Sequence, residues 1–141
     1  MKRYLLAAHY EGDKTPLWEQ LRGLGPDASF FVAVPATPAP TKEWTWSEEE
    51  SYQIAKQRLD KTLREMQDAG LQAKGQVLNY SVQEAIEEAL KNHPFDELIV
   101  STLPSTEAHT EFQDYERRVR RFSQIPMRHI VNERAQEIER A

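Results

Sequence analysis

The sequence predicts a single α/β domain in which helices cover both faces of a five-stranded parallel sheet. Short apolar runs, typical of strands buried on both faces, alternate with segments whose apolar residues recur at helical spacing. The length of 141 residues is that of one domain, and the chain has no internal repeat. Strands that alternate with helices pair in parallel through right-handed crossovers. We therefore expect a doubly wound, Rossmann-like three-layer sandwich with strand order 3-2-1-4-5.

Five apolar runs are the expected strands. The third of them is the least apolar, with Lys74 and Gln76 alternating outward, which predicts a position at the edge of the sheet. The last run follows Pro126. The expected strands are residues 4–8, 30–34, 73–78, 98–100 and 127–131.

Four helical patterns separate these runs. Two of them open with capping boxes, in which Ser47 pairs with Glu50 and Ser81 with Glu84. The apolar stripe of the second helix is expected on Tyr52, Ala55, Leu59, Leu63, Met66 and Ala69, and Gly70 closes that helix. The fourth helix follows a polar segment at 101–110 and buries Phe112, Tyr115, Val119 and Phe122.

The charge and composition exclude several classes of function. A nucleic-acid partner is not expected, because the net charge is −5 and such proteins are normally basic. The chain has no cysteine, which removes disulfides, thiolate metal sites and cysteine catalysis. Its four histidines lack metal-ligand spacing, so no metal site is expected. No apolar run is long enough to span a membrane, and charges closely follow the first run, so we expect a cytoplasmic protein without a signal peptide or membrane contact.

The predicted fold itself places a ligand site. In an open parallel sheet, ligands bind beyond the carboxyl ends of the strands, at the point where the strand order reverses. With order 3-2-1-4-5 this crevice lies between the first and fourth strands. For each serine or threonine hydroxyl in this crevice, the alternative to ligand binding is a structural role, in which the hydroxyl satisfies backbone groups or caps a helix. The predicted ligand-binding residues are His9, Tyr10, Glu11, Val34, Ser101, Thr102, Ser105 and Thr106.

Three segments carry a resemblance to a known family. They are the polar turn HYEG at 9–12, the strand entry FDELIV at 95–100, and RRVRRFSQIPM at 117–127. Together they resemble the universal stress protein family over residues 3–131. The resemblance implies a five-stranded sheet and homodimers that pair through strand 127–131. It also implies ATP or AMP binding in one subclass of the family.

The sequence departs from the ATP-binding subclass at the residues that hold phosphate. That subclass has an aspartate after the first strand, where this chain has His9. Ser101 and Pro104 stand at its first two glycine positions, and no glycine occurs after Gly75. Glycine matters there because a backbone without Cβ approaches phosphate closely. The family's usual ATP grip is therefore missing.

The cluster of Arg117, Arg118, Arg120 and Arg121 is the strongest positive feature. Arginine forks suit phosphate, so an anion site is one interpretation. The other is a solvated, salt-bridged helix face, because Glu111, Asp114 and Glu116 lie close by in the sequence. The second interpretation is favoured.

Three functions remain, in order of preference. The first is a non-enzymatic, universal-stress-like homodimer acting in stress response or regulation, with residues 1–132 as its domain and 133–141 as a charged tail. The second is a binder of AMP, ATP or another small molecule in the crevice. The third is a hydrolase or nucleotidyl-type enzyme, in which a hydrolytic triad would combine Ser101 or Ser105 with His9 or His109 and an acid. No Gly-x-Ser-x-Gly elbow supports that third function, and no catalytic residue is predicted.

Overall fold

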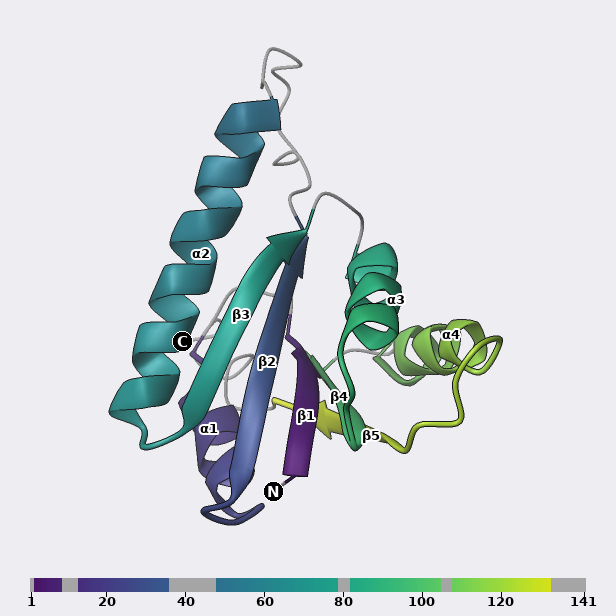
Figure 1. The fold of residues 1–141 in the computed structure, drawn as a ribbon. Helices are drawn as coiled ribbons and strands as arrows, with labels where there is room; N and C mark the ends of the chain where they lie inside the picture. Colours follow the sequence, from purple (N-terminus) through teal and green to yellow (C-terminus); the bar gives the residue numbers. More distant parts are fainter. Residues whose placement is uncertain (1, 9–12, 36–47, 79–81, 105–107, 133–141) are drawn as a thin grey trace.

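The computed structural model describes residues 2–8, 13–35, 48–78, 82–104 and 108–132. They form a five-stranded parallel sheet in the order β3-β2-β1-β4-β5, which confirms the predicted fold class (Figure 1). The strands are β1 Lys2–Ala7, β2 Ala28–Pro35, β3 Gln72–Leu78, β4 Glu97–Thr102 and β5 Met127–Val131. The helices are α1 Thr15–Arg22, α2 Glu48–Asp68, α3 Val82–Asn92 and α4 Ala108–Val119.

The helices cover the two faces of the sheet in pairs. One core cluster joins α1 and α2 to the sheet through residues such as Leu17, Leu59 and Phe30. The other joins α3 and α4 to the opposite face through Ile86 and Val119. Right-handed crossovers require this division, because the chain moves outward from β1 to β3 and then returns across the sheet to β4. Among the described helices, none is long and apolar enough to cross a membrane.

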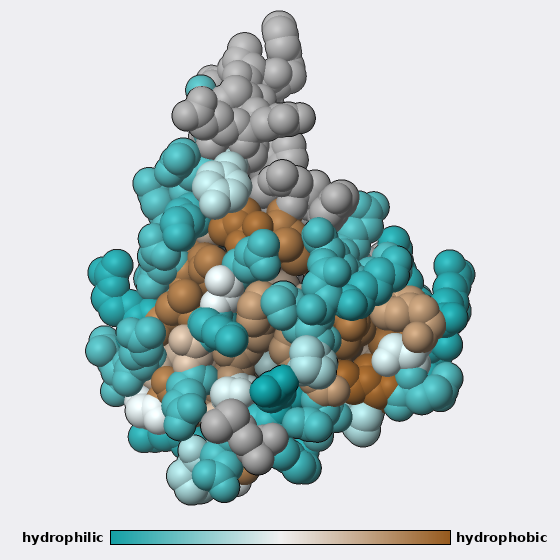
Figure 2. Space-filling view, viewed as in Figure 1, coloured by the Kyte–Doolittle hydropathy of each residue, from teal (hydrophilic) through white to brown (hydrophobic). Residues whose placement is uncertain are grey.

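The second face is only partly covered. The helix α3 packs on β1 and β2, and α4 packs on β5, so β3 and part of β2 lie open on this side (Figure 1). Figure 2 shows brown and pale atoms exposed between α2 and α3, with hydrophilic side chains on both sides. The expected edge position of β3 is confirmed, and its residues alternate between exposed and half-buried.

Two expected element limits were wrong. Ser101 and Thr102 were assigned to a polar loop, but they complete β4, where pairing with β5 satisfies their backbone groups. The helix α4 starts inside the expected polar segment, at Ala108, which is buried. The hydroxyl-bearing Ser101 and Thr102 therefore extend β4 beyond its apolar run, and the small residue Ala108 begins α4 earlier than expected. The expected tail, residues 133–141, and the capping residues Ser47 and Ser81 lie outside the described residues.

Two aromatic residues expected in the core are exposed. Phe122 is 39% exposed, because α4 ends at Val119 and Phe122 lies beyond it in a turn. Its ring instead lies under the Lys91 ammonium, 5.9 Å from the ring centroid. Tyr52 is 40% exposed, and it belongs to the first turns of α2, which extend past the end of β3 (Figure 1).

The arginine cluster is mainly structural. Arg117 pairs with Asp114 within α4 at 3.6 Å, which confirms the expected salt-bridged face. Arg118 reaches across to Glu87 on α3, and this hydrogen-bonded pair raises the pKa of the guanidinium. Arg120 donates to the Ile125 carbonyl at 2.6 Å and so holds the loop that leads into β5. Arg120 was expected on the helix face with Arg117, but the helix ends before it.

Gly75 sets the distance between α2 and β3. A Cβ built on it would lie 2.5 Å from the Val32 carbonyl oxygen and 2.6 Å from a methyl group of Leu59 on α2. Glycine is required here because both neighbours belong to the packed core, and one of them is backbone.

Replacing Gly75 tests this close approach. We expect Gly75→Ala to lower the free energy of unfolding by about 1–3 kcal/mol, because the added methyl group overpacks the α2–β3 contact. Urea unfolding measures the change. Gln76→Ala is the matched control, since Gln76 is exposed on the other side of the same strand. Equal stabilities for the two variants would contradict the close approach.

Candidate functional site

The predicted crevice lies at the carboxyl ends of β1 and β4, which are neighbours in the sheet. Five of its eight predicted residues lie outside the described part of the chain: His9, Tyr10, Glu11, Ser105 and Thr106. The structure places the other three, Val34, Ser101 and Thr102.

Val34 and Ser101 lie on either side of the end of β1. The registers pair Leu6 with Val32 on β2 and with Ile99 on β4, so two residues further on Ala8 lies level with both Val34 and Ser101. Side chains alternate along a strand, so Ser101 shares the α1/α2 face with Ile99 and Val34. Val34 is 9% exposed and belongs to the core cluster of that face. Its side chain therefore packs in the core and offers a ligand little surface.

Thr102 points to the opposite face of the sheet, toward β5. Its hydroxyl shares a hydrogen bond of 2.8 Å with Nε2 of His129. The imidazole of His129 stacks on Phe112 of α4, with centroids 4.7 Å apart and an interplanar angle of 3°. Thr102 is 3% exposed, and its hydroxyl is committed to this part-buried pair with His129.

The environment of His129 disfavours its protonated form. Burial lowers the pKa of the imidazole, and the nearby His109 on α4 lowers it further. His109 itself lies within hydrogen-bond distance of Gln113, at 3.1 Å. These residues form a polar cluster that joins β4, β5 and α4. The sequence offered no sign of it, since the pairing depends on the register between two strands.

Asn132 links three elements at the carboxyl end of the sheet. It directly follows β5 and is 1% exposed. Its backbone N–H donates to the Thr102 carbonyl at 2.8 Å. Its side-chain amide donates to the Asp13 carbonyl at 2.9 Å, just before α1. The Asp13 carboxylate in turn accepts hydrogen bonds from the N–H and the hydroxyl of Thr15.

The arrangement does not support the hydrolase that combines Ser101 with His109. Ser101 belongs to the α1/α2 face, whereas His109 lies with His129 on the α4 face. The other two candidates, Ser105 and His9, lie outside the described residues. Within the part of the chain that the structure describes, no group of three or more metal-ligating side chains gathers.

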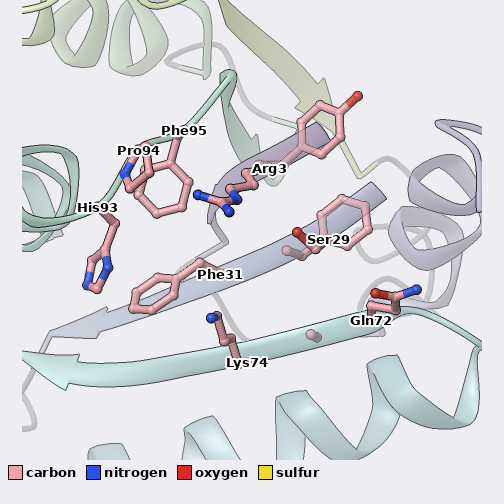
Figure 3. A pocket seen from close by; sticks show the side chains of 11 residues that line it. Arg3, Ser29, Phe31, Gln72, Lys74, His93, Pro94 and Phe95 are labelled. Carbon is pink, nitrogen blue, oxygen red and sulfur yellow. The ribbon is translucent and has the colours of Figure 1, made fainter. Parts of the chain in front are cut away.

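A cavity of about 440 Å³ lies at the other end of the sheet, near the amino ends of the strands. It occupies the open part of the α3/α4 face, over β2 and β3 (Figure 3). Its polar and aromatic lining comes mainly from Arg3, Ser29, Phe31, Lys74, His93 and Phe95. Sequence reasoning missed it. The only signal was the outward position of Lys74 on an edge strand, which predicts exposure but no cavity.

The sequence matches no protein-family model and no curated protein. The structure does match solved structures. A protein of the universal stress protein family from Burkholderia pseudomallei aligns with TM-score 0.54 and 15% identity, covering 90% of this chain and 94% of that one. A universal stress protein family protein from Arabidopsis thaliana, solved with AMP bound, aligns with TM-score 0.54 and 10% identity, covering 96% and 94%. The hypothetical protein MJ0577 aligns with TM-score 0.56 and 13% identity, covering 94% and 98%.

These matches show that the chain has the fold of the universal stress proteins. The strand order β3-β2-β1-β4-β5 and the alternation of strands and helices agree with that fold over nearly the whole chain.

The low pKa of His129 predicts a pH effect on stability. The unfolded chain protonates this imidazole near pH 6.5, but the folded protein does so only at lower pH. Because the unfolded state binds more protons in that window, stability falls as the pH drops through 6.5 and is fully restored above it. In the His129→Gln variant this part of the pH dependence should vanish.

Urea unfolding between pH 7.5 and 5.5 measures the effect, and the imidazole resonances of His129 give its titration midpoint directly. A midpoint below 6.5 is expected. His109→Gln should move it upward by removing the neighbouring charge. A midpoint at or above 6.5 in the wild-type protein would contradict the burial of this ring.

Proposed function

We propose that the chain is a non-enzymatic, universal-stress-like domain that acts as a homodimer in stress response or regulation, pairing through β5. The observation that carries the proposal is the position of β5 at the edge of the sheet, where its outer side is not occupied by another described strand. An edge strand of this kind is a template for pairing with a second chain. Two copies related by a two-fold axis would pair antiparallel.

The hydrogen bonds of β5 define which of its amides would pair. Leu98 donates to the Pro126 carbonyl at 2.9 Å, and Asn132 donates to the Thr102 carbonyl at 2.8 Å. Backbone N–H and C=O groups alternate in direction along a strand. Those of the even-numbered residues of β5 therefore point toward β4. The odd-numbered residues, among them Val131, direct their N–H and C=O groups to the open edge. These groups would form the dimer ladder.

The state of the crevice supports a role without ATP held in the family's usual way. Thr102 is bonded to His129, and Ser101 is 4% exposed within β4. Pro104 follows and has no N–H to offer a phosphate. A phosphate grip of backbone amides requires the opposite features, namely glycines and unencumbered N–H groups. Protein contacts are therefore the favoured mode of action.

A second candidate is a nucleotide-binding protein that uses the same crevice with different contacts. It is favoured by one observation, that the Arabidopsis protein of the same fold was solved with AMP bound. The ligand would meet the ends of β1 and β4, close to Ser101 and Leu103. This candidate differs from the first in requiring a ligand at the carboxyl edge of the sheet.

The dimer is tested by changing one outward amide. Val131→Pro removes the N–H that faces the open edge and leaves the ladder with β4 intact, a position where edge strands tolerate proline. Light scattering at micromolar concentration should give twice the 16.4 kDa chain mass for the wild type and a shift toward the monomer for Val131→Pro. The dimer dissociation constant should rise at least about tenfold. The substitution is present in both copies of the dimer, so it removes two hydrogen bonds.

The control is Val131→Ala, which trims the same side chain but keeps the amide and should stay dimeric. Circular dichroism of each variant reports whether the fold is retained. A wild-type monomer would refute the proposed dimer. Equal dimer affinities for the proline and alanine variants would show that another surface pairs the chains.

A further inference from the structure

The amino-end cavity combines two cations with a wall of aromatic rings. Arg3 on β1 and Lys74 on β3 extend into it from either side of Phe31 on β2 (Figure 3). The strand registers place Arg3 level with Ser29 on β2, and Lys74 level with Phe31. Ser29 and Phe31 are two residues apart on β2 and therefore lie on the same face. Arg3, Phe31 and Lys74 thus share one face of the sheet. Among the described residues that line the cavity there is no carboxylate. This is notable in a chain whose net charge is −5.

Neither cation is neutralised within the described part of the chain. The ion pairs found there join other residues, and none of them includes Arg3 or Lys74. The Asp96 carboxylate accepts a hydrogen bond from the backbone N–H of Arg3 at 2.7 Å. Asp96 does not line the cavity. A guanidinium fork and an ammonium that converge on one space are a typical anion-binding arrangement.

Three rings form the wall next to α3. Phe31 lies 4.9 Å from His93 and 5.8 Å from Phe95, measured between ring centroids, and His93 lies 6.2 Å from Phe95. His93 and Pro94 directly follow α3, so this wall stands at the helix C-terminus, where the backbone carries partial negative charge. An anionic group would avoid that end, while an uncharged ring would pack there at offset-stacking or edge-to-face distance.

We propose that this cavity is a binding site for a small aromatic anion. Its ring packs against His93, Phe95 and Phe31, and its acid group lies between Arg3 and Lys74. The cavity volume of about 440 Å³ lies in the range of small-molecule pockets. The site lies at the amino ends of the strands, at the opposite edge of the sheet from the predicted crevice, and it does not depend on the proposed dimer.

Carboxylates and phosphates both match a guanidinium fork, so the acid group is determined by experiment. We would titrate the ¹⁵N-labelled protein with benzoate and with phenyl phosphate and follow its amide resonances. Saturable shifts are expected at Arg3, Lys74 and Phe95. The tighter of the two probes identifies the acid group. Benzyl alcohol, which lacks the charge, and inorganic phosphate, which lacks the ring, should each bind at least about tenfold more weakly.

Charge-removing variants show whether the cavity is responsible. Arg3→Gln and Lys74→Gln should each weaken binding of the tighter probe about tenfold, the loss expected for one charge-assisted hydrogen bond. Lys61→Gln is the matched control, because it removes the same charge from an exposed position on α2, which packs on the other face of the sheet. Native amide spectra would confirm that all three variants fold.

Three results would overturn the proposal. The first is the absence of saturable shifts with either probe. The second is a loss of affinity in Lys61→Gln as large as in the two cavity variants, which would indicate attraction to surface charge in general. The third is a set of shifts confined to residues away from Arg3, Lys74 and Phe95.

Discussion

The central place of β1, between β2 and β4, is the constraint on which the rest of the structure depends. The chain leaves β1 toward one edge of the sheet and must cross back to reach β4 on the other side. Right-handed crossovers then oblige α1 and α2 to cover one face and α3 and α4 the other. The same reversal determines where the crevice is predicted, at the carboxyl ends of β1 and β4. It also limits what α3 can cover, because this helix crosses above β1 and β2 and leaves β3 open.

The two ends of the sheet are chemically different as a result. At the carboxyl end, polar side chains are directed into structural contacts: Thr102 to His129, and Asn132 to the chain that enters α1. These contacts hold β4, β5 and α1 together, and they leave fewer groups to grip a phosphate. At the amino end, the open strip of sheet keeps two cations and a group of rings next to an empty space. An unpaired charge is costly in a core but is tolerated on a partly exposed face, where water or a ligand can solvate it.

Much of the architecture could be predicted from the sequence because its signals are local. The apolar runs and helical patterns placed all nine described elements, and their alternation implied parallel strands, for which 3-2-1-4-5 was the expected order. Element ends were less certain, since Thr102 and Ala108 extend their elements through tertiary contacts that no local pattern carries. Phe122 was placed in the core because its helical spacing continues past Val119, whereas the helix stops there. The cavity depended on register, which brings Arg3 and Lys74, 71 positions apart, to the same face.

An AMP titration of the labelled protein is the most direct test of the chemical difference between the two ends of the sheet. AMP is the nucleotide that the second candidate function would bind in the crevice, and it is also an aromatic anion, the class of ligand proposed for the amino-end cavity. Amide shifts would show which end of the sheet responds. The account predicts saturable shifts at Arg3, Lys74 and Phe95, which Lys74→Gln weakens, and no saturable shifts at Ser101, Thr102 and Leu103. Saturable shifts at the end of β4, with Arg3 and Lys74 unmoved, would contradict it and place the ligand in the crevice between β1 and β4.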